Sequence, residues 1–168
     1  MTLAFAASGQ GTLAYTVNGV VVSKPIERQA FGTAVTCLPT SGSRAGATNF
    51  QDLWSNPLEP GWGVNLAHQG NTIFAALFTY AADGRDLWLF ASGLARQPNG
   101  SFTGTLYRTT GPAFNASPWF APVVSSVGSM TLSFANGTTG TIAYTVDGIA
   151  VSKPIERQVF GTQPPICR

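Results

Sequence analysis

Polar and apolar residues alternate with a period of two along much of this chain, in short runs that end at turn-forming residues. Such alternation is typical of strands that bury one face. It predicts seven strands, at residues 61–69, 72–80, 86–93, 101–110, 129–134, 139–146 and 149–160. The run 72–80 is apolar on both faces, so we expect both of its faces to be buried.

Tight turns connect most of these strands. The dipeptides Asp83-Gly84 and Asn99-Gly100 favour the positive φ values of type I′ hairpins. No helical stretch is long enough for a crossover connection, so the strands should pair antiparallel. A meander of seven or eight strands usually closes, because closure removes exposed edges. We therefore predict an all-β, up-and-down barrel, with a two-sheet β-sandwich as the alternative.

One stretch of the chain occurs twice. Residues 1–33 recur at 130–162 without a gap, and 23 of the 33 positions are identical. We interpret 1–33 as the tail of a preceding repeat, 34–51 as a linker and 52–168 as a complete repeat unit. A single barrel then has two candidates for its last three strands. The first copy is expected to extend a barrel edge, pair with a neighbouring unit or swap between molecules.

Two further segments bear on assembly. Residues 111–128 contain three prolines and break the strand rhythm, so we expect a long connection in which Phe114, Trp119 and Phe120 cover an end of the sheet. The sequence KPIERQ, at 24–29 and again at 153–158, places ionic groups along a strand. These groups either form ordinary surface ion pairs or make the contact between successive units.

Composition excludes several classes of function. Charged residues make up 10 % of the chain, well under the roughly 25 % usual for soluble domains. The net charge of +2 comes from scattered residues, so no basic run could neutralise several phosphates, and we expect no nucleic-acid partner. No apolar run reaches the length of a membrane-spanning helix. The opening residues lack the basic region of a signal peptide, so we expect any targeting signal to lie outside this chain.

The two cysteines follow the two copies of the repeat. A bridge between Cys37 and Cys167 would close a loop of about 130 residues, worth up to roughly 5 kcal/mol in the chain-entropy model. It would also fit an extracytoplasmic location. The alternative is two free thiols.

The richest candidate site surrounds the sequence Gly-Trp-Gly at 61–63. Sugars and small polar ligands are commonly held by stacking on aromatic rings and by hydrogen bonds at their rims. The residues that could act in this way are Glu59, Trp62, Asn65, His68, Gln69, Tyr80, Trp88 and Tyr107. The alternative is a structural corner, in which Glu59 accepts turn N–H groups and Trp62 closes the barrel floor.

No catalytic or metal site is expected. His68 is the only histidine, and the cysteines and scattered acids lack the spacing of metal ligands. No Gly-x-Ser-x-Gly sequence presents a nucleophilic serine. The acids Asp83 and Asp147 lie in turn dipeptides, where aspartate is favoured for its conformation. We therefore predict no enzyme activity and no cofactor.

The stretch 52–93 resembles a largely uncharacterised repeat domain found in secreted or surface proteins of bacteria. The resemblance extends over about 52–162 and again over 11–33. It rests on Trp54, Asn56, Pro57, Glu59, Gly61, Trp62, Gly63, Asn65, Gln69, Gly70, Phe74, Phe78, Thr79, Tyr80, Gly84, Trp88 and the run 104–111. The chain has Leu53-Trp54 where that domain often has Trp-Trp, and Glu59-Pro60 where it often has Glu-Ser. The resemblance implies an all-β module, often in tandem, with no established activity.

These observations together predict a non-catalytic structural or interaction repeat module of a bacterial extracytoplasmic protein. Its expected partners are neighbouring repeat units, or other copies bound through the duplicated strands. The alternative is a small-ligand or glycan-binding barrel of lipocalin or avidin type, with a glycan or a small apolar molecule as its ligand. A ligand-binding barrel should enclose a lined cavity, whereas a structural module should be filled by its own side chains.

Overall fold

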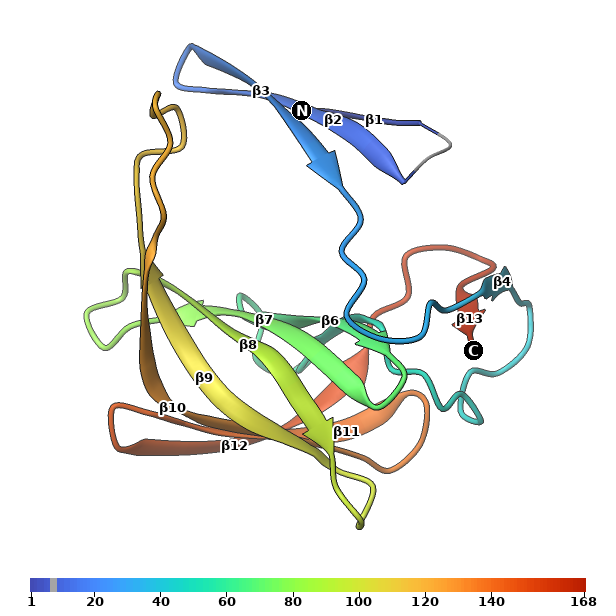
Figure 1. The fold of residues 1–168 in the computed structure, drawn as a ribbon. Helices are drawn as coiled ribbons and strands as arrows, with labels where there is room; N and C mark the ends of the chain where they lie inside the picture. The colour runs from blue at the N-terminus through green and yellow to red at the C-terminus, as the bar shows by residue number, and fades with distance from the viewer. Residues whose placement is uncertain (7–8) are drawn as a thin grey trace. The chain divides into compact units, whose positions relative to one another are not determined.

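All regular elements of the described chain are β-strands (Figure 1). The computed structural model describes residues 1–6 and 9–168. The strands before the barrel are β1 (Thr2–Phe5), β2 (Gln10–Val17), β3 (Val20–Glu27) and β4 (Cys37–Pro39). The barrel strands are β5 (Asp52–Ser55), β6 (Gly63–Gln69), β7 (Thr72–Tyr80), β8 (Asp86–Arg96), β9 (Phe102–Thr110), β10 (Val123–Phe134), β11 (Thr139–Val146) and β12 (Ile149–Arg157). The last strand is β13 (Pro165–Cys167).

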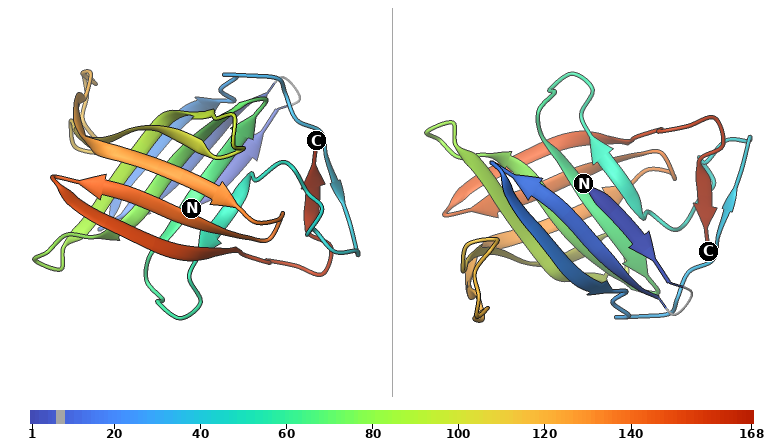
Figure 2. Two further views of the ribbon diagram at one scale, coloured as in Figure 1. Left: turned by 90° about the horizontal axis from the view of Figure 1, so that it is seen from below. Right: turned by 90° about the horizontal axis from the view of Figure 1, so that it is seen from above.

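Strands β5 to β12 form a closed barrel in which neighbours in the chain are neighbours in the sheet. Figure 2 shows this barrel from two sides. Closure joins β12 to β5, where Glu156 lies opposite Ser55 and Arg157 lies opposite Trp54. The predicted up-and-down antiparallel barrel is thus confirmed, and the sandwich alternative is not adopted.

The barrel interior is filled by apolar side chains. Inward positions alternate with outward ones along each strand, as the period of two requires. The fully buried residues with the largest side chains are Trp54, Phe102, Leu66, Ile73, Leu77, Leu89, Leu94, Leu106, Met130, Leu132, Ile142 and Ile155. These side chains form one continuous core, to which every barrel strand contributes at least one residue.

Packing divides the chain into two compact units. One unit comprises Met1–Phe31 and Thr110–Val123, and the other comprises Gly32–Thr109 and Val124–Arg168. In the first unit β1, β2 and β3 form an antiparallel sheet in that order. Its pairing repeats that of the barrel: Leu3 lies opposite Leu13 as Leu132 lies opposite Ile142. The duplicated sequence therefore forms the same three-stranded sheet twice.

The segment 34–51, which the sequence predicts to be a linker, is a structured part of the barrel unit. Its short strand β4 pairs with β13, with Cys37 opposite Cys167. The sequence allows either a bridge or two free thiols at these cysteines. In the structure they are joined by a disulfide. Arg44 and Asn49 are buried, and Phe50 packs against the core. The polar side chains of Arg44 and Asn49 can be buried because they form hydrogen bonds within the barrel unit. The composition of the segment does not reveal these partners.

The connection at 111–128 also differs from expectation. Its last residues belong to β10, so the irregular part ends near Pro122. This part belongs to the first compact unit. The Phe114 ring lies 6.2 Å from that of Tyr15, and the Lys24 ammonium lies 3.9 Å from the centre of the Trp119 ring.

Candidate functional site

The residues that the sequence nominates for ligand binding lie in three separate places. Glu59 and Trp62 precede β6, whereas His68 and Gln69 lie at its far end. Asn65, Tyr80, Trp88 and Tyr107 point outward from the barrel strands. The structure therefore does not bring the nominated residues together in one pocket.

The first place is an ionic cluster where β12 meets the loop before β6. The Trp62 Nε1–H donates to Glu59 Oε2 at 3.2 Å, and the Lys153 ammonium donates to the same oxygen. The ammonium also lies 5.3 Å from the centre of the Trp62 ring. The hydrogen bond from Lys153 is the main reason that the pKa of Glu59 is lowered. The cluster fastens this loop to β12. Glu59 accepts here from two side-chain donors, whereas the structural-corner alternative supposes that it accepts from turn N–H groups.

The two glycines of Gly-Trp-Gly have steric roles. Gly61 has φ of 105°, a conformation that side chains disfavour, and a Cβ there would lie 3.3 Å from the Tyr80 hydroxyl. A Cβ on Gly63 would lie 3.1 Å from the Trp54 carbonyl oxygen. Both positions allow close packing around Trp62, so the motif is explained by local geometry.

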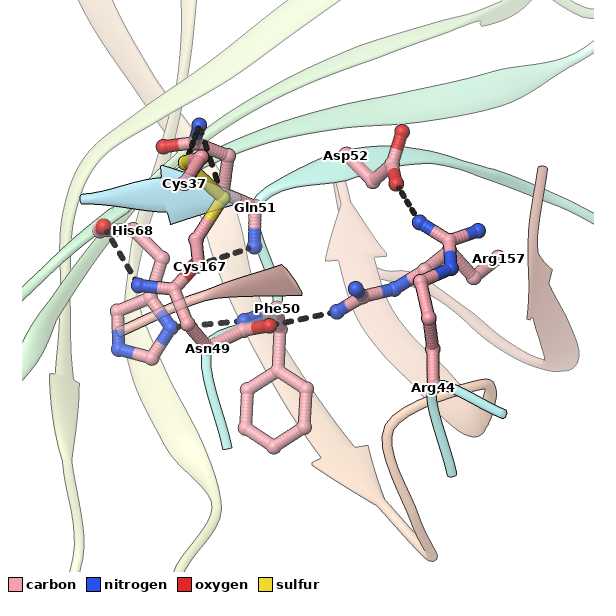
Figure 3. Close-up of a disulfide and its surroundings, with 9 residues drawn as sticks. All are labelled: Cys37, Arg44, Asn49, Phe50, Gln51, Asp52, His68, Arg157 and Cys167. Carbon is pink, nitrogen blue, oxygen red and sulfur yellow. Dashed lines mark hydrogen bonds and ion pairs between the residues drawn. A yellow bond between two sulfur atoms is a disulfide. The ribbon is translucent and has the colours of Figure 1, made fainter. Parts of the chain in front are cut away.

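The second place surrounds His68, which is buried (Figure 3). The Phe50 N–H donates to His68 Nδ1 at 3.0 Å, and His68 Nε2 lies 2.9 Å from the Gly70 carbonyl oxygen. This pair of contacts requires the neutral tautomer with its proton on Nε2. The ring stacks on Phe50 with centroids 5.7 Å apart. Burial is the main cause that lowers the pKa of His68.

A hollow of about 250 Å³ adjoins His68 and is also lined by Asn49, Arg96 and Arg168. Both ring nitrogens of His68 already have backbone partners, so the ring has no nitrogen left for a ligand or a metal ion. Gln69 is similarly engaged, since its Oε1 accepts from the Gly32 N–H at 3.1 Å. These two residues serve the packing of the chain at this end of the barrel.

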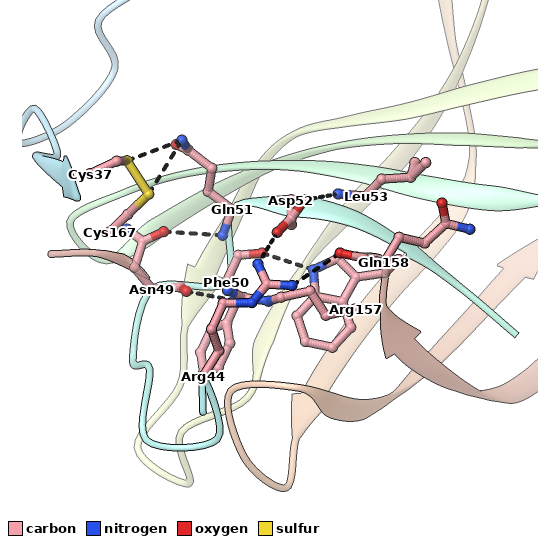
Figure 4. A network of polar contacts seen from close by, with 11 residues as sticks. Cys37, Arg44, Asn49, Phe50, Gln51, Asp52, Leu53, Arg157, Gln158 and Cys167 are labelled. Atoms are coloured by element: carbon pink, nitrogen blue, oxygen red, sulfur yellow. Dashed lines mark hydrogen bonds and ion pairs between the residues drawn. A yellow bond between two sulfur atoms is a disulfide. The ribbon is translucent and has the colours of Figure 1, made fainter. Parts of the chain in front are cut away.

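Two buried arginines complete the closure of the barrel on this side (Figure 4). Arg44 donates to Asp52 at 2.6 Å and to the Gln158 carbonyl oxygen at 3.0 Å. Arg157 donates to the Asn49 carbonyl oxygen at 2.7 Å, and its guanidinium lies 5.0 Å from the centre of the Trp54 ring. Burial, assisted by the nearby Arg44 charge, lowers the pKa of Arg157 to about 10. The second KPIERQ copy therefore lies where β12 pairs with β5 to close the barrel.

The third place is an aromatic surface on the outside of β7, β8 and β9. These three strands are neighbours in the barrel (Figure 1). We call this surface the aromatic face, and it consists of Phe74, Phe78, Tyr80, Trp88, Phe90 and Tyr107. The rings of Phe78 and Trp88 stack at 6.0 Å, those of Phe74 and Phe90 at 6.3 Å, and those of Phe90 and Tyr107 at 5.4 Å.

Part of the aromatic face is open to solvent. Trp88 is 63 % exposed and Phe78 is 47 % exposed. The outer side of the strand 72–80 is thus only partly buried: Ala76 is buried there, whereas Phe78 and Tyr80 are exposed. The expectation that both sides are buried is therefore met only in part. The alternation predicts that Phe74, Phe78 and Tyr80 lie on one side of β7. It could not say which side faces water, because both sides are apolar.

No family model, no curated protein and no solved structure matches this chain. Within residues 1–6 and 9–168, no three His, Cys, Asp or Glu side chains lie close enough together to hold a metal ion. The described part of the chain also contains no helix long and apolar enough to span a membrane.

Proposed function

We propose that this protein is a non-catalytic interaction repeat module and that the aromatic face is its contact surface. The main observation that supports this proposal is the contrast between the inner and outer sides of β7 to β9. Their inner side is filled by buried core residues such as Leu77, Leu89 and Leu106. Their outer side presents stacked rings to solvent, and contiguous exposed apolar surface of this kind marks interaction sites.

The favoured partner is another unit of the same kind. Aromatic side chains contribute large contact areas at little entropic cost, and they dominate the energetics of many interfaces. The resemblance to bacterial repeat modules and the duplicated strands support assembly from several units. The disulfide between Cys37 and Cys167 supports an extracytoplasmic location, where such bonds persist.

Self-association tests this proposal. In sedimentation velocity, the full oxidised chain should associate reversibly as its concentration rises. Trp88→Ser should weaken the association at least tenfold, about 1.4 kcal/mol. Val124→Ser, at an exposed apolar residue outside the aromatic face, is the matched control and should change little. Sedimentation as a monomer at every soluble concentration would contradict the proposal.

A glycan is the second candidate for the same surface. The observation that favours it is that Trp88 and Tyr80 are both exposed on the aromatic face, since sugars stack on exposed rings whose rims carry hydroxyl groups. The filled barrel interior counts against a ligand enclosed in the lipocalin manner. Binding on a glycan array that Trp88→Ser abolishes, without self-association, would favour this candidate.

A further inference from the structure

The two copies of the duplicated strands differ in what covers one of their faces. In β10 to β12 this face is turned into the barrel. We call the corresponding face of β1 to β3 the inner face, and it consists of Met1, Leu3, Phe5, Gly11, Leu13, Tyr15, Val22, Lys24, Ile26 and Arg28. Leu132 is fully buried and its counterpart Leu3 is 48 % exposed, while Met130 is fully buried and Met1 is 90 % exposed.

One end of the inner face is covered in a similar way in both copies. In the barrel, the Lys153 ammonium lies 5.3 Å from the centre of the Trp62 ring. In the first unit, the Lys24 ammonium lies 3.9 Å from the centre of the Trp119 ring. The irregular segment before β10 thus supplies the aromatic cover for this end.

The other end of the inner face is a hollow of about 670 Å³, lined by Phe5, Ala6, Gly9, Gly11, Ile26, Glu27 and Arg28. In the barrel, the counterparts Phe134 and Arg157 meet two aromatic side chains at this point. Phe50 stacks on Phe134 with centroids 3.7 Å apart. Trp54 lies 5.0 Å from the Phe134 ring and 5.0 Å from the Arg157 guanidinium. The hollow is therefore the counterpart of the place that Phe50 and Trp54 fill in the barrel.

The edge of the sheet points to the same kind of occupant. In the barrel, β12 pairs with β5 through Glu156 and Arg157. Their counterparts are Glu27, the last residue of β3, and Arg28, which follows it. The strand β3 is one of the two edge strands in the order β1-β2-β3. A segment that enters the hollow from this side can add to the sheet as a fourth strand. Recognition would then combine backbone pairing with pockets for alternate side chains.

We propose that the β1–β3 sheet binds an extended segment of another repeat unit that carries Phe and Trp four residues apart, as Phe50 and Trp54 are in this chain. In this chain Phe50 precedes β5 and Trp54 lies within it, and their ring centroids are 6.5 Å apart, so both rings can enter the hollow together. Arg28 stacks on the Trp ring and donates to a backbone carbonyl, as Arg157 does in the barrel. The proposal names a partner for the interaction module and uses a surface other than the aromatic face, so either proposal can fail alone.

A peptide of residues 48–56 tests this inference, with a fluorophore at its N-terminus and fluorescence anisotropy as the measurement. The full oxidised chain should bind the peptide saturably. Peptides with Phe50→Ala or Trp54→Ala should bind at least tenfold more weakly, because each loses one ring from the hollow. Equal binding of the three peptides, or no binding of the unchanged one, overturns the inference.

Variants of the protein locate the binding site. Ile26→Asp and the milder Arg28→Ala should each weaken binding at least tenfold. Val21→Asp is the matched control, because Val21 is exposed on the opposite face of β3 and should leave binding unchanged. Undiminished binding by both Ile26→Asp and Arg28→Ala would mean that the peptide enters the barrel or another surface, and would overturn the inference.

Discussion

His68 is the only histidine of the chain, and its environment ties stability to pH. Nδ1 accepts from the Phe50 N–H, so a proton on Nδ1 would bring two donors face to face. The folded protein therefore favours the neutral ring, and burial acts in the same direction to lower its pKa below 6.5. The unfolded chain binds a proton more readily than the folded chain, so acid should favour unfolding.

We predict that His68 causes no change in the free energy of unfolding above pH 6.5. This free energy should fall as the pH drops from 6.5 through the lowered pKa, by at most about 1.4 kcal/mol per pH unit. Denaturant unfolding at pH 7.5 and 5.5 measures the difference, and an NMR titration of the single imidazole gives its pKa directly. His68→Gln should remove this part of the pH dependence. An imidazole pKa at or above 6.5 would contradict the prediction.

Residue roles were readable from the sequence only where they are local. The turns at Asn18-Gly19 and Asp147-Gly148 take positive φ at both residues, as a type I′ turn requires. At Asp83-Gly84 and Asn99-Gly100 the structure differs from the predicted type I′ turns, because only the two glycines have positive φ. The Asp83 carboxylate accepts from the Arg85 N–H, and the Asn99 side-chain oxygen accepts from the Ser101 N–H. The contact between Lys153 and Glu59 joins residues 94 positions apart, and no spacing pattern could reveal it.

At the level of elements, the duplicated strands show that a sequence can specify a sheet without specifying what the sheet packs against. The copies share their pairing but differ in the cover of one face. The alternation correctly predicts seven of the eight barrel strands, β6 to β12, and misses β5. The strand β5 has only four residues. Its partner β12 lies far away in the sequence, so no hairpin turn predicts that the two strands pair.

The two copies supply a matched pair of mutations. Leu132→Ala should destabilise the barrel by about 2–5 kcal/mol, because it leaves a cavity in a filled core. Leu3→Ala, at the equivalent position of the exposed copy, should cost less than about 1 kcal/mol. Denaturant unfolding followed by near-ultraviolet circular dichroism measures both. Equal costs would mean that the two faces are covered to the same extent.

At the level of the whole molecule, the disulfide joins the two ends of the barrel unit. Cys37 and Cys167 are separated by 130 positions. The bridge lies in the small β4–β13 sheet, where the Gln51 amide lies 3.7 Å from one sulfur and 3.8 Å from the other. It therefore encloses all eight barrel strands in one covalent loop.

Removal of this bridge should destabilise the barrel, because the unfolded chain gains conformational freedom. The Cys37→Ser/Cys167→Ser double variant should lose about 2–5 kcal/mol of unfolding free energy, and the unchanged chain under reducing conditions should lose a similar amount. Thermal or denaturant unfolding with and without reductant measures the effect. An unchanged midpoint in the double variant would contradict this expectation.

The position of the bridge also has a mechanical consequence. A pulling force applied to the two ends of the chain would pass from Cys37 to Cys167 through the sulfur atoms. The barrel between them would carry no tension while the bond is intact, and roughly 450 Å of extensible chain would stay out of the load path. Under tension, the barrel would keep its fold while the segment before Cys37, which includes the β1–β3 sheet, bore the load. Reduction of a single bond would change the protein from a stiff link into an extensible one.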